Sequence, residues 1–145
     1  MAETYTLNVA GLTRELTICK VDDHMDIAAF IMLGDTELTV AAAAELLKKC
    51  PEFDILLTAE AKSIPLIHEM ARQSGAEKYF LARKGPKAYM SGVFEVHVKS
   101  ITTMDVQRLV IDTADAELIK GKRILIVDDV ISTGESLRAM EELVT

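Results

Sequence analysis

The sequence contains no tryptophan, only two cysteines and three prolines, and aromatic residues make up 5% of its 145 positions. Cys19 and Cys50 are too few for a disulfide framework and form no CxxC pair, so we expect two half-buried thiols in a reducing compartment. No apolar run reaches the roughly 20 residues of a membrane helix. Residues 1–6 lack the basic and then apolar pattern of a signal peptide. These absences predict a cytoplasmic protein without a membrane partner.

The chain also has no excess of basic residues. Its formal net charge of −7 argues against a nucleic-acid partner, because such proteins need a basic face. A small anionic ligand remains possible, since backbone N–H groups can hold a phosphate whatever the net charge. Half of the residues are apolar, which is enough for one core. With no internal repeat and no linker, we expect a single domain over residues 1–145.

Hydrophobic patterning predicts an α/β fold. The stretch FDILL at 53–57 is typical of a strand that is buried on both faces. The alanine-rich stretch 38–49 is the best helix, and Pro51 prevents its continuation. We further expect strands at 16–19, 78–82 and 124–127, an apolar helical patch at 26–33, helices at 65–74 and from residue 136, a mobile loop at 83–92, and an antiparallel ribbon from 94–101 and 107–111.

This order of elements predicts a mainly parallel central sheet that is flanked by helices. The chain ends about two turns into its last helix, where a doubly wound sheet would normally add a strand. We therefore describe the C-terminus as short.

The most informative stretch is ILIVDDVISTGES, at 124–136. A buried strand ends in two acids, Asp128 and Asp129, at the sheet edge where ligands of open α/β folds bind. Small polar residues then lead into a helix, whose N-terminus can hold a phosphate. This combination predicts a ligand that carries both a phosphate and a diol. The structural alternative is a strand followed by a capped helix. A receiver domain is excluded, because no further strands follow with the required acid and lysine.

The same residues resemble the signature of the type I phosphoribosyltransferases, and the fold that this family implies is Rossmann-like. The resemblance implies that Asp128 and Asp129 contact the ribose hydroxyls of phosphoribosyl pyrophosphate, partly through Mg²⁺. It also implies a 5′-phosphate loop of Ser132, Thr133, Gly134, Glu135 and Ser136. Many members have glycine where this chain has Glu135, so we expect that carboxylate to point outward or to weaken binding.

Two further stretches match the adenine and xanthine branches of that family. Glu60, Ala61, Lys62 and Ser63 follow the 53–57 strand where those branches hold pyrophosphate, although Lys62 and Ser63 replace the usual residues. The 83–92 loop supplies Arg83, Lys84 and Lys87, whose cations reach pyrophosphate in those branches, often in the neighbouring subunit. By themselves these stretches are also consistent with an ordinary helix N-terminus and a solvated run of charge.

The resemblance therefore implies transfer of a 5-phosphoribosyl group to a purine base, with release of pyrophosphate, by a homodimer. In the family a variable hood covers the base, and residues 1–34 could supply part of it. Two alternatives stay open, namely a non-catalytic regulator that binds phosphoribosyl pyrophosphate and a truncated, inactive member. Asp105 is the acid nearest to the ribbon tip, but no catalytic role is assigned to it. The three histidines, His24, His68 and His97, show no metal-ligand spacing.

Overall fold

A computed structural model describes residues 3–99, 106–131 and 134–144. Its centre is a short parallel sheet in the order β5-β4-β8. The middle strand β4 (Ile55–Ala59) pairs with β5 (Phe80–Ala82) on one side and with β8 (Ile124–Ile126) on the other. β4 is buried because helices cover both faces of the sheet, as its run of apolar residues predicts. The predicted α/β class and parallel sheet are confirmed.

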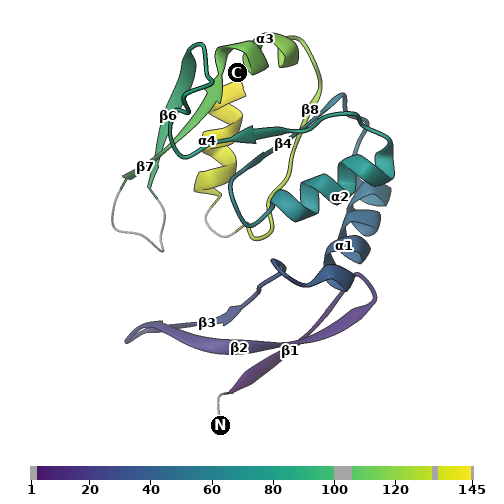
Figure 1. The fold of residues 1–145 in the computed structure, drawn as a ribbon. Helices are drawn as coiled ribbons and strands as arrows, with labels where there is room; N and C mark the ends of the chain where they lie inside the picture. Colours follow the sequence, from purple (N-terminus) through teal and green to yellow (C-terminus); the bar gives the residue numbers. More distant parts are fainter. Residues whose placement is uncertain (1–2, 100–105, 132–133, 145) are drawn as a thin grey trace.

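Helices α1 (Thr36–Lys49) and α2 (Ile64–Ser74) cover one face of this sheet (Figure 1). Their apolar residues form one core cluster together with Leu56 of β4. Asp35 caps α1 by accepting a hydrogen bond from the Leu38 N–H. Gly75 ends α2 with a φ of 80°, the left-handed conformation that favours glycine at this position. Both helices were predicted within two residues.

The opposite face is covered by α4 (Glu135–Val144), α3 (Thr113–Ile119) and an antiparallel ribbon. The ribbon strands β6 (Val93–Lys99) and β7 (Val106–Asp112) were predicted, whereas α3 was not. The ribbon joins the main sheet through Arg83 and Val110, whose N–H groups each donate to the other residue's carbonyl at 2.8 Å. Arg83 therefore begins a loop whose first residue is fixed by the ribbon. Asp105 and the ribbon tip lie outside the described residues.

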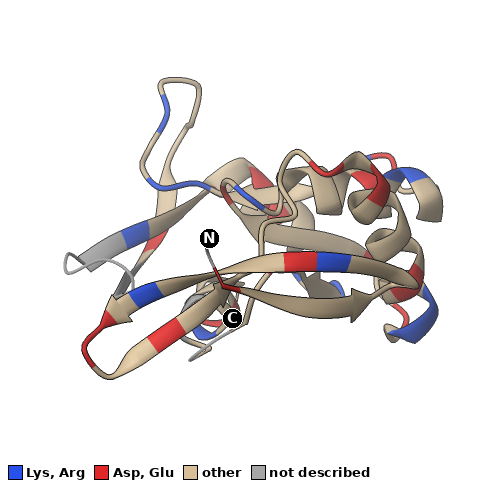
Figure 2. Cartoon of the chain, turned by 90° about the horizontal axis from the view of Figure 1, so that it is seen from below, with Lys and Arg blue, Asp and Glu red and all other residues tan. Residues whose placement is uncertain are grey.

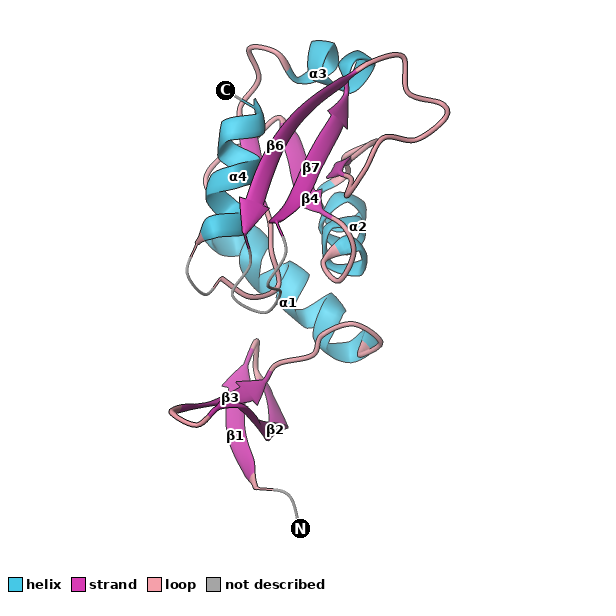
Figure 3. Ribbon diagram, turned by 90° about the vertical axis from the view of Figure 1, so that its left-hand side faces the viewer, coloured by secondary structure: helices cyan, strands magenta, loops and turns pink. Residues whose placement is uncertain are grey.

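A second sheet, made of three antiparallel strands, lies below α1 in Figure 1 and is seen from another side in Figure 3. It consists of β1 (Thr4–Val9), β2 (Leu12–Asp22) and β3 (Met25–Ala29). Ala10 and Gly11 join β1 to β2, both with positive φ, which is the two-residue turn that matches the twist of a hairpin. Within residues 4–29 only Leu16 is buried.

Two sequence expectations for this region were wrong. The strand predicted at 16–19 extends over the whole of β2, because both of its edges find antiparallel partners. The helical patch predicted at 26–33 is instead β3 and an extended segment, since Ile27 and Ala28 pair across the sheet with Cys19 and Ile18. Local apolar content was outweighed here by cross-strand pairing.

Two smaller expectations concern the thiols and the membrane. Cys50 is half-buried as expected, but Cys19 is exposed, because it lies on the solvent-facing side of the N-terminal sheet. No helix in the described part of the chain combines the length and apolar character needed to cross a membrane. Figure 2 shows acidic and basic residues interspersed over the helices and the N-terminal strands.

Candidate functional site

The acid pair lies at the carboxyl end of the central sheet. Asp128 and Asp129 follow β8, and the fold brings Ser63 of the 60–63 loop against them. The Ser63 Oγ is 3.1 Å from Asp128 Oδ1 and 3.2 Å from Asp129 Oδ1. It also accepts the Asp129 N–H at 3.0 Å. Two stretches that the sequence singled out separately therefore form one cluster.

The two carboxylates influence each other's charge. Partial burial, followed by the hydrogen bond with Asp129, raises the pKa of Asp128 from 3.8 to about 6. The Asp129 N–H, which donates to Asp128 Oδ1 at 2.8 Å, and the Ser63 hydroxyl act in the opposite direction. A cation between the carboxylates would remove the repulsion. The pair is thus poised to bind a positive charge.

Thr58 holds the backbone just after β8 in place, and the sequence analysis did not single it out. Its side chain is fully buried in β4, and its Oγ1 donates to the Val127 carbonyl at 2.5 Å. Val127 directly precedes the acids, so this bond fixes the backbone from which they project. A threonine at the end of an apolar strand was the available signal, but its partner lies 69 residues away.

Glu60 contacts the 83–92 loop, called the basic loop below because it contains Arg83, Lys84 and Lys87. Its carboxylate accepts a hydrogen bond from the Arg83 Nε at 3.0 Å and from the Lys84 N–H at 2.7 Å. Burial raises the pKa of Glu60, but the Lys84 N–H and the charges of Arg83 and Lys87 outweigh it, so the pKa is lowered overall. The Arg83 Nη1 also donates to the Tyr89 hydroxyl at 2.8 Å. The structure therefore joins the 60–63 and 83–92 loops through one ion pair, between Glu60 and Arg83, and one backbone hydrogen bond, from the Lys84 N–H.

The other predicted loop residues are placed less fully. Lys62 and Lys84 are exposed, Lys87 is half-buried, and Ala61 follows Glu60 through a cis peptide bond. Gly134 has a φ of 83°, a conformation in which any other residue would be strained, and it leads into α4. Ser132 and Thr133 lie outside the described residues. Glu135 and Ser136 form the first turn of α4, but the expected direction of the Glu135 side chain is not among the described features.

A pocket of about 550 Å³ opens between the N-terminal sheet and α1, and both acids line it. The β1–β2 hairpin contributes Leu7, Val9, Ala10 and Gly11, and the segment after β3 contributes Phe30 and Met32. The helix side is formed by residues of α1 and α2, which are Ala42, Glu45, Leu46, Lys49 and Leu66. The pocket is therefore mostly apolar, with the acid pair as one polar boundary.

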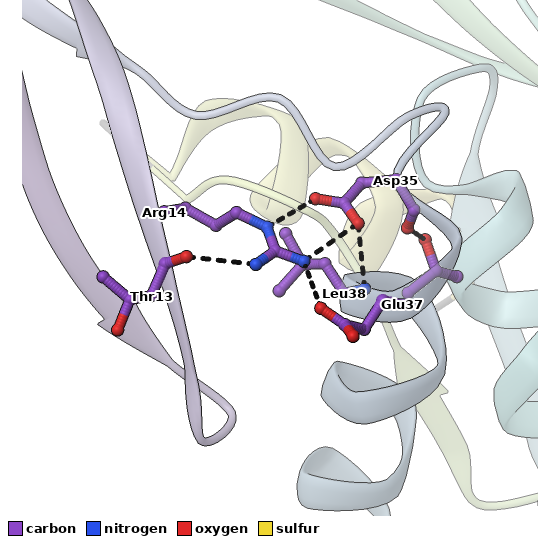
Figure 4. Close-up of polar contacts among 6 residues, drawn as sticks. Thr13, Arg14, Asp35, Glu37 and Leu38 are labelled. Carbon is purple, nitrogen blue, oxygen red and sulfur yellow. Dashed lines mark hydrogen bonds and ion pairs between the residues drawn. The ribbon is translucent and has the colours of Figure 1, made fainter.

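Arg14 joins the N-terminal sheet to the start of α1 (Figure 4). Its guanidinium contacts Asp35 through two nitrogens, at 2.7 and 3.2 Å, and Glu37 at 2.9 Å. The hydrogen bonds from the Arg14 guanidinium and from the Leu38 N–H stabilise the Asp35 carboxylate and lower its pKa. Sequence reasoning missed this contact, because Arg14 and Asp35 lie in different elements. It fixes one wall of the pocket relative to the other.

The histidines are consistent with structural or surface positions. His68 lies beside Tyr79, with its Nδ1 3.2 Å from the phenol oxygen and the two rings edge to face. His24 is exposed in the turn between β2 and β3. The side chain of His97 is not described. Within the described ranges, no three His, Cys, Asp or Glu side chains gather as a protein-only metal site.

Comparison with known proteins places this geometry in a family. The model of the phosphoribosyl transferase domain matches residues 32–145. The chain belongs to the phosphoribosyl transferase domain family. No curated protein matches the sequence.

Among solved structures, the adenine phosphoribosyltransferase from Thermoanaerobacter pseudethanolicus has a similar fold, with a TM-score of 0.62 at 22% sequence identity. The match covers 76% of this chain and 62% of that one. The resemblance inferred from the 124–136 motif is therefore confirmed for the family and the fold. The acid pair lies inside the region that matches the phosphoribosyl transferase domain. The strands β1, β2 and β3 precede that region.

Proposed function

We propose that this phosphoribosyl transferase domain moves a 5-phosphoribosyl group from phosphoribosyl pyrophosphate to a purine base and releases pyrophosphate. The observation that carries the proposal is that one pocket joins an apolar space to the acid pair. A planar base would fit between the β1–β2 hairpin and α1. The ribose of phosphoribosyl pyrophosphate would lie at Asp128 and Asp129. The volume of about 550 Å³ falls within the range of small-molecule sites.

The acid pair would hold the ribose hydroxyls and Mg²⁺. Magnesium takes oxygen ligands and usually keeps waters or ligand phosphates, so two carboxylates suffice as its protein ligands. Burial, and then the neighbouring Asp129, raise the pKa of Asp128, and a bound cation would favour the charged form of both carboxylates. When bound, Mg²⁺ would neutralise charge on the departing pyrophosphate.

The cations of Lys62, Lys84 and Lys87 would stabilise the charge that develops on pyrophosphate. Arg83 would join them only after leaving Glu60 and Tyr89. Backbone N–H groups of residues 132–136, the loop that the family signature assigns to the 5′-phosphate, would bind that phosphate. Closure of the 83–92 loop would exclude water and so protect the activated sugar from hydrolysis.

The N-terminal residues 1–34 would act as the hood, because they supply one wall of the pocket. A purine is favoured by the similarity in fold to an adenine enzyme. Glu45 and Lys49, one helical turn apart on α1, offer an acceptor and a donor for the edge of such a base. We place this activity in nucleotide salvage, in a cytoplasmic homodimer, with residues 1–145 acting as one domain.

One observation favours a second candidate, a non-catalytic protein that binds phosphoribosyl pyrophosphate as a signal. Arg83, the first cation of the basic loop, is engaged by Glu60 and Tyr89. A protein that only senses the ligand could keep this arrangement. A truncated, inactive member of the family would also bind without turnover.

The deciding experiment titrates the protein with phosphoribosyl pyrophosphate and Mg²⁺, and then follows pyrophosphate release with adenine, hypoxanthine, guanine and xanthine. Release with one base supports the transferase, whereas binding without release for any base supports the second candidate. The double variant Asp128→Asn/Asp129→Asn should lose binding while remaining folded. Asp22→Asn/Asp23→Asn, an adjacent pair of exposed acids that do not line the pocket, is the matched control and should keep the parent's affinity for phosphoribosyl pyrophosphate. Absence of binding by the unmodified chain would contradict both candidates.

A further inference from the structure

Ser63 occupies the N-cap position of α2, yet its hydroxyl does not cap the helix. The residue is 2% exposed, and its side chain makes no hydrogen bond to the first turn. A serine at this position usually accepts a backbone N–H two or three residues later, which stabilises the helix by about 1 kcal/mol. That contact is missing because the hydroxyl faces the end of β8 instead.

The hydroxyl contacts three atoms of the acid pair. It lies 3.1 Å from Asp128 Oδ1 and 3.2 Å from Asp129 Oδ1, and it accepts the Asp129 N–H at 3.0 Å. A hydroxyl has a single proton, so that proton is shared between the two carboxylate oxygens. The Asp129 N–H is likewise shared with Asp128 Oδ1. Four polar groups from two distant loops thus form one closed network.

The Ser63 hydroxyl contacts only one oxygen of each carboxylate. That oxygen is Oδ1 in both acids, and the Asp129 N–H also donates to an Oδ1 atom, that of Asp128. Asp128 and Asp129 also line the pocket. The hydroxyl therefore anchors one oxygen of each carboxylate.

We infer that Ser63 is a positioning residue whose hydroxyl orients Asp128 and Asp129 together for binding Mg²⁺ and the ribose of phosphoribosyl pyrophosphate. This inference rests on the proposed function. Without the hydroxyl, the two carboxylates lose their shared donor and repel each other more strongly. Their Oδ2 atoms are then no longer held in one arrangement before the ligand arrives, and affinity falls.

The test compares Ser63→Ala and Ser63→Gly with the unmodified protein. Both variants lack the hydroxyl, but glycine is an acceptable N-cap residue and alanine is a poor one, so effects on α2 differ between them. Ser74→Ala is the matched control, since that hydroxyl bonds the Ala71 carbonyl at the other end of the same helix. Calorimetry with phosphoribosyl pyrophosphate and Mg²⁺ gives the affinity, and hydrogen exchange of the Asp129 amide reports on the network without ligand.

We expect both Ser63 variants to bind about tenfold more weakly, with faster exchange at Asp129, and Ser74→Ala to bind normally. Loss of thermal stability in the Ser63 variants with unchanged affinity would overturn the inference, because it would show a structural role alone. Tighter binding would overturn it as well, since the hydroxyl would then be an obstacle that the ligand displaces. If the unmodified chain does not bind, the proposed function fails first and the inference fails with it.

Discussion

The Arg14 Nε lies 2.7 Å from Asp35 Oδ2, and the Arg14 Nη2 lies 3.2 Å from Asp35 Oδ1. The two contacts together form an ion pair between β2 and the N-cap residue of α1. Such forked contacts fix orientation as well as distance. We predict that Arg14→Ala loosens the N-terminal sheet from α1. Hydrogen exchange over residues 4–29 should rise at least several-fold, and the KM for the base should rise more than the affinity for phosphoribosyl pyrophosphate falls.

Lys20→Ala is the control for this prediction, because Lys20 forms an exposed ion pair with Asp23 on the same sheet. It should leave exchange and KM unchanged. Equal behaviour of Arg14→Ala and Lys20→Ala would argue against an anchoring role for Arg14.

The ion pair of Asp35 also depends on pH. Because the pKa of Asp35 is lowered, the pair stabilises the fold above the ordinary carboxyl pKa of 3.8. This contribution disappears as the pH falls through the pKa of the folded state.

Glu60→Gln should release Arg83 from the 60–63 loop. The glutamine carbonyl can still accept the Lys84 N–H, but the charged contact with Arg83 is lost. We expect a loss of about 1 kcal/mol in the free energy of unfolding at pH 7. Because the pKa of Glu60 is lowered, the difference between variant and parent should shrink as pH falls below its ordinary value of 4.5. Chemical denaturation at pH 7 and pH 3.5 measures it, and a constant difference would contradict the ion-pair explanation.

Much of the fold could be predicted because local signals were strong. The apolar stretch around Leu56 and the alanine-rich helix α1 each carry their own periodicity and end at a clear breaker. β3 could not be predicted in this way, because its strand character depends on pairing with β2. The hairpin did leave a signal, the alternation on both sides of Ala10 and Gly11, which the shorter strand prediction did not use.

The candidate site shows the same division. Asp128 and Asp129 are adjacent in a motif whose strand and turn position them, so the sequence was enough to single them out. The contact with Ser63 joins residues 65 and 66 positions apart, and no local rule connects them. The apolar wall of the pocket could not be predicted from the sequence for a related reason. Its residues come from the hairpin and from α1, and each is an ordinary apolar residue until the fold places it beside the acids.

Asp128→Asn should stabilise the ligand-free protein while removing Mg²⁺-dependent binding. The asparagine carbonyl can replace Oδ1 as acceptor for Ser63 and for the Asp129 N–H, without the repulsion between two carboxylates. A folded pKa of about 6 against the ordinary 3.8 means that the folded state binds the proton more tightly, so the parent loses stability as pH rises from about 4 to about 6. Partial exposure reduces this loss to about 1 to 2 kcal/mol.

Urea denaturation of Asp128→Asn at pH 4 and pH 8 in the presence of a chelator tests this expectation. The variant should be more stable than the parent at pH 8, with a smaller advantage at pH 4. Asp26→Asn, on an exposed position of β3, serves as the control and should change little at either pH. A variant that is less stable at pH 8 would mean that the carboxylate of Asp128 contributes to the ligand-free fold.

Thr58→Val tests whether the backbone below the acid pair is held by a side-chain bond. Valine preserves the shape but cannot donate to the Val127 carbonyl, which would be left without this partner in a fully buried position. We expect a loss of about 1 to 2 kcal/mol in the free energy of unfolding, together with weaker binding of phosphoribosyl pyrophosphate. Thr58→Ser keeps the hydroxyl and removes only a methyl group, so it should lose stability but retain the affinity of the parent. If serine and valine reduced affinity equally, packing at this position, and not the hydrogen bond to Val127, would be what positions the acids.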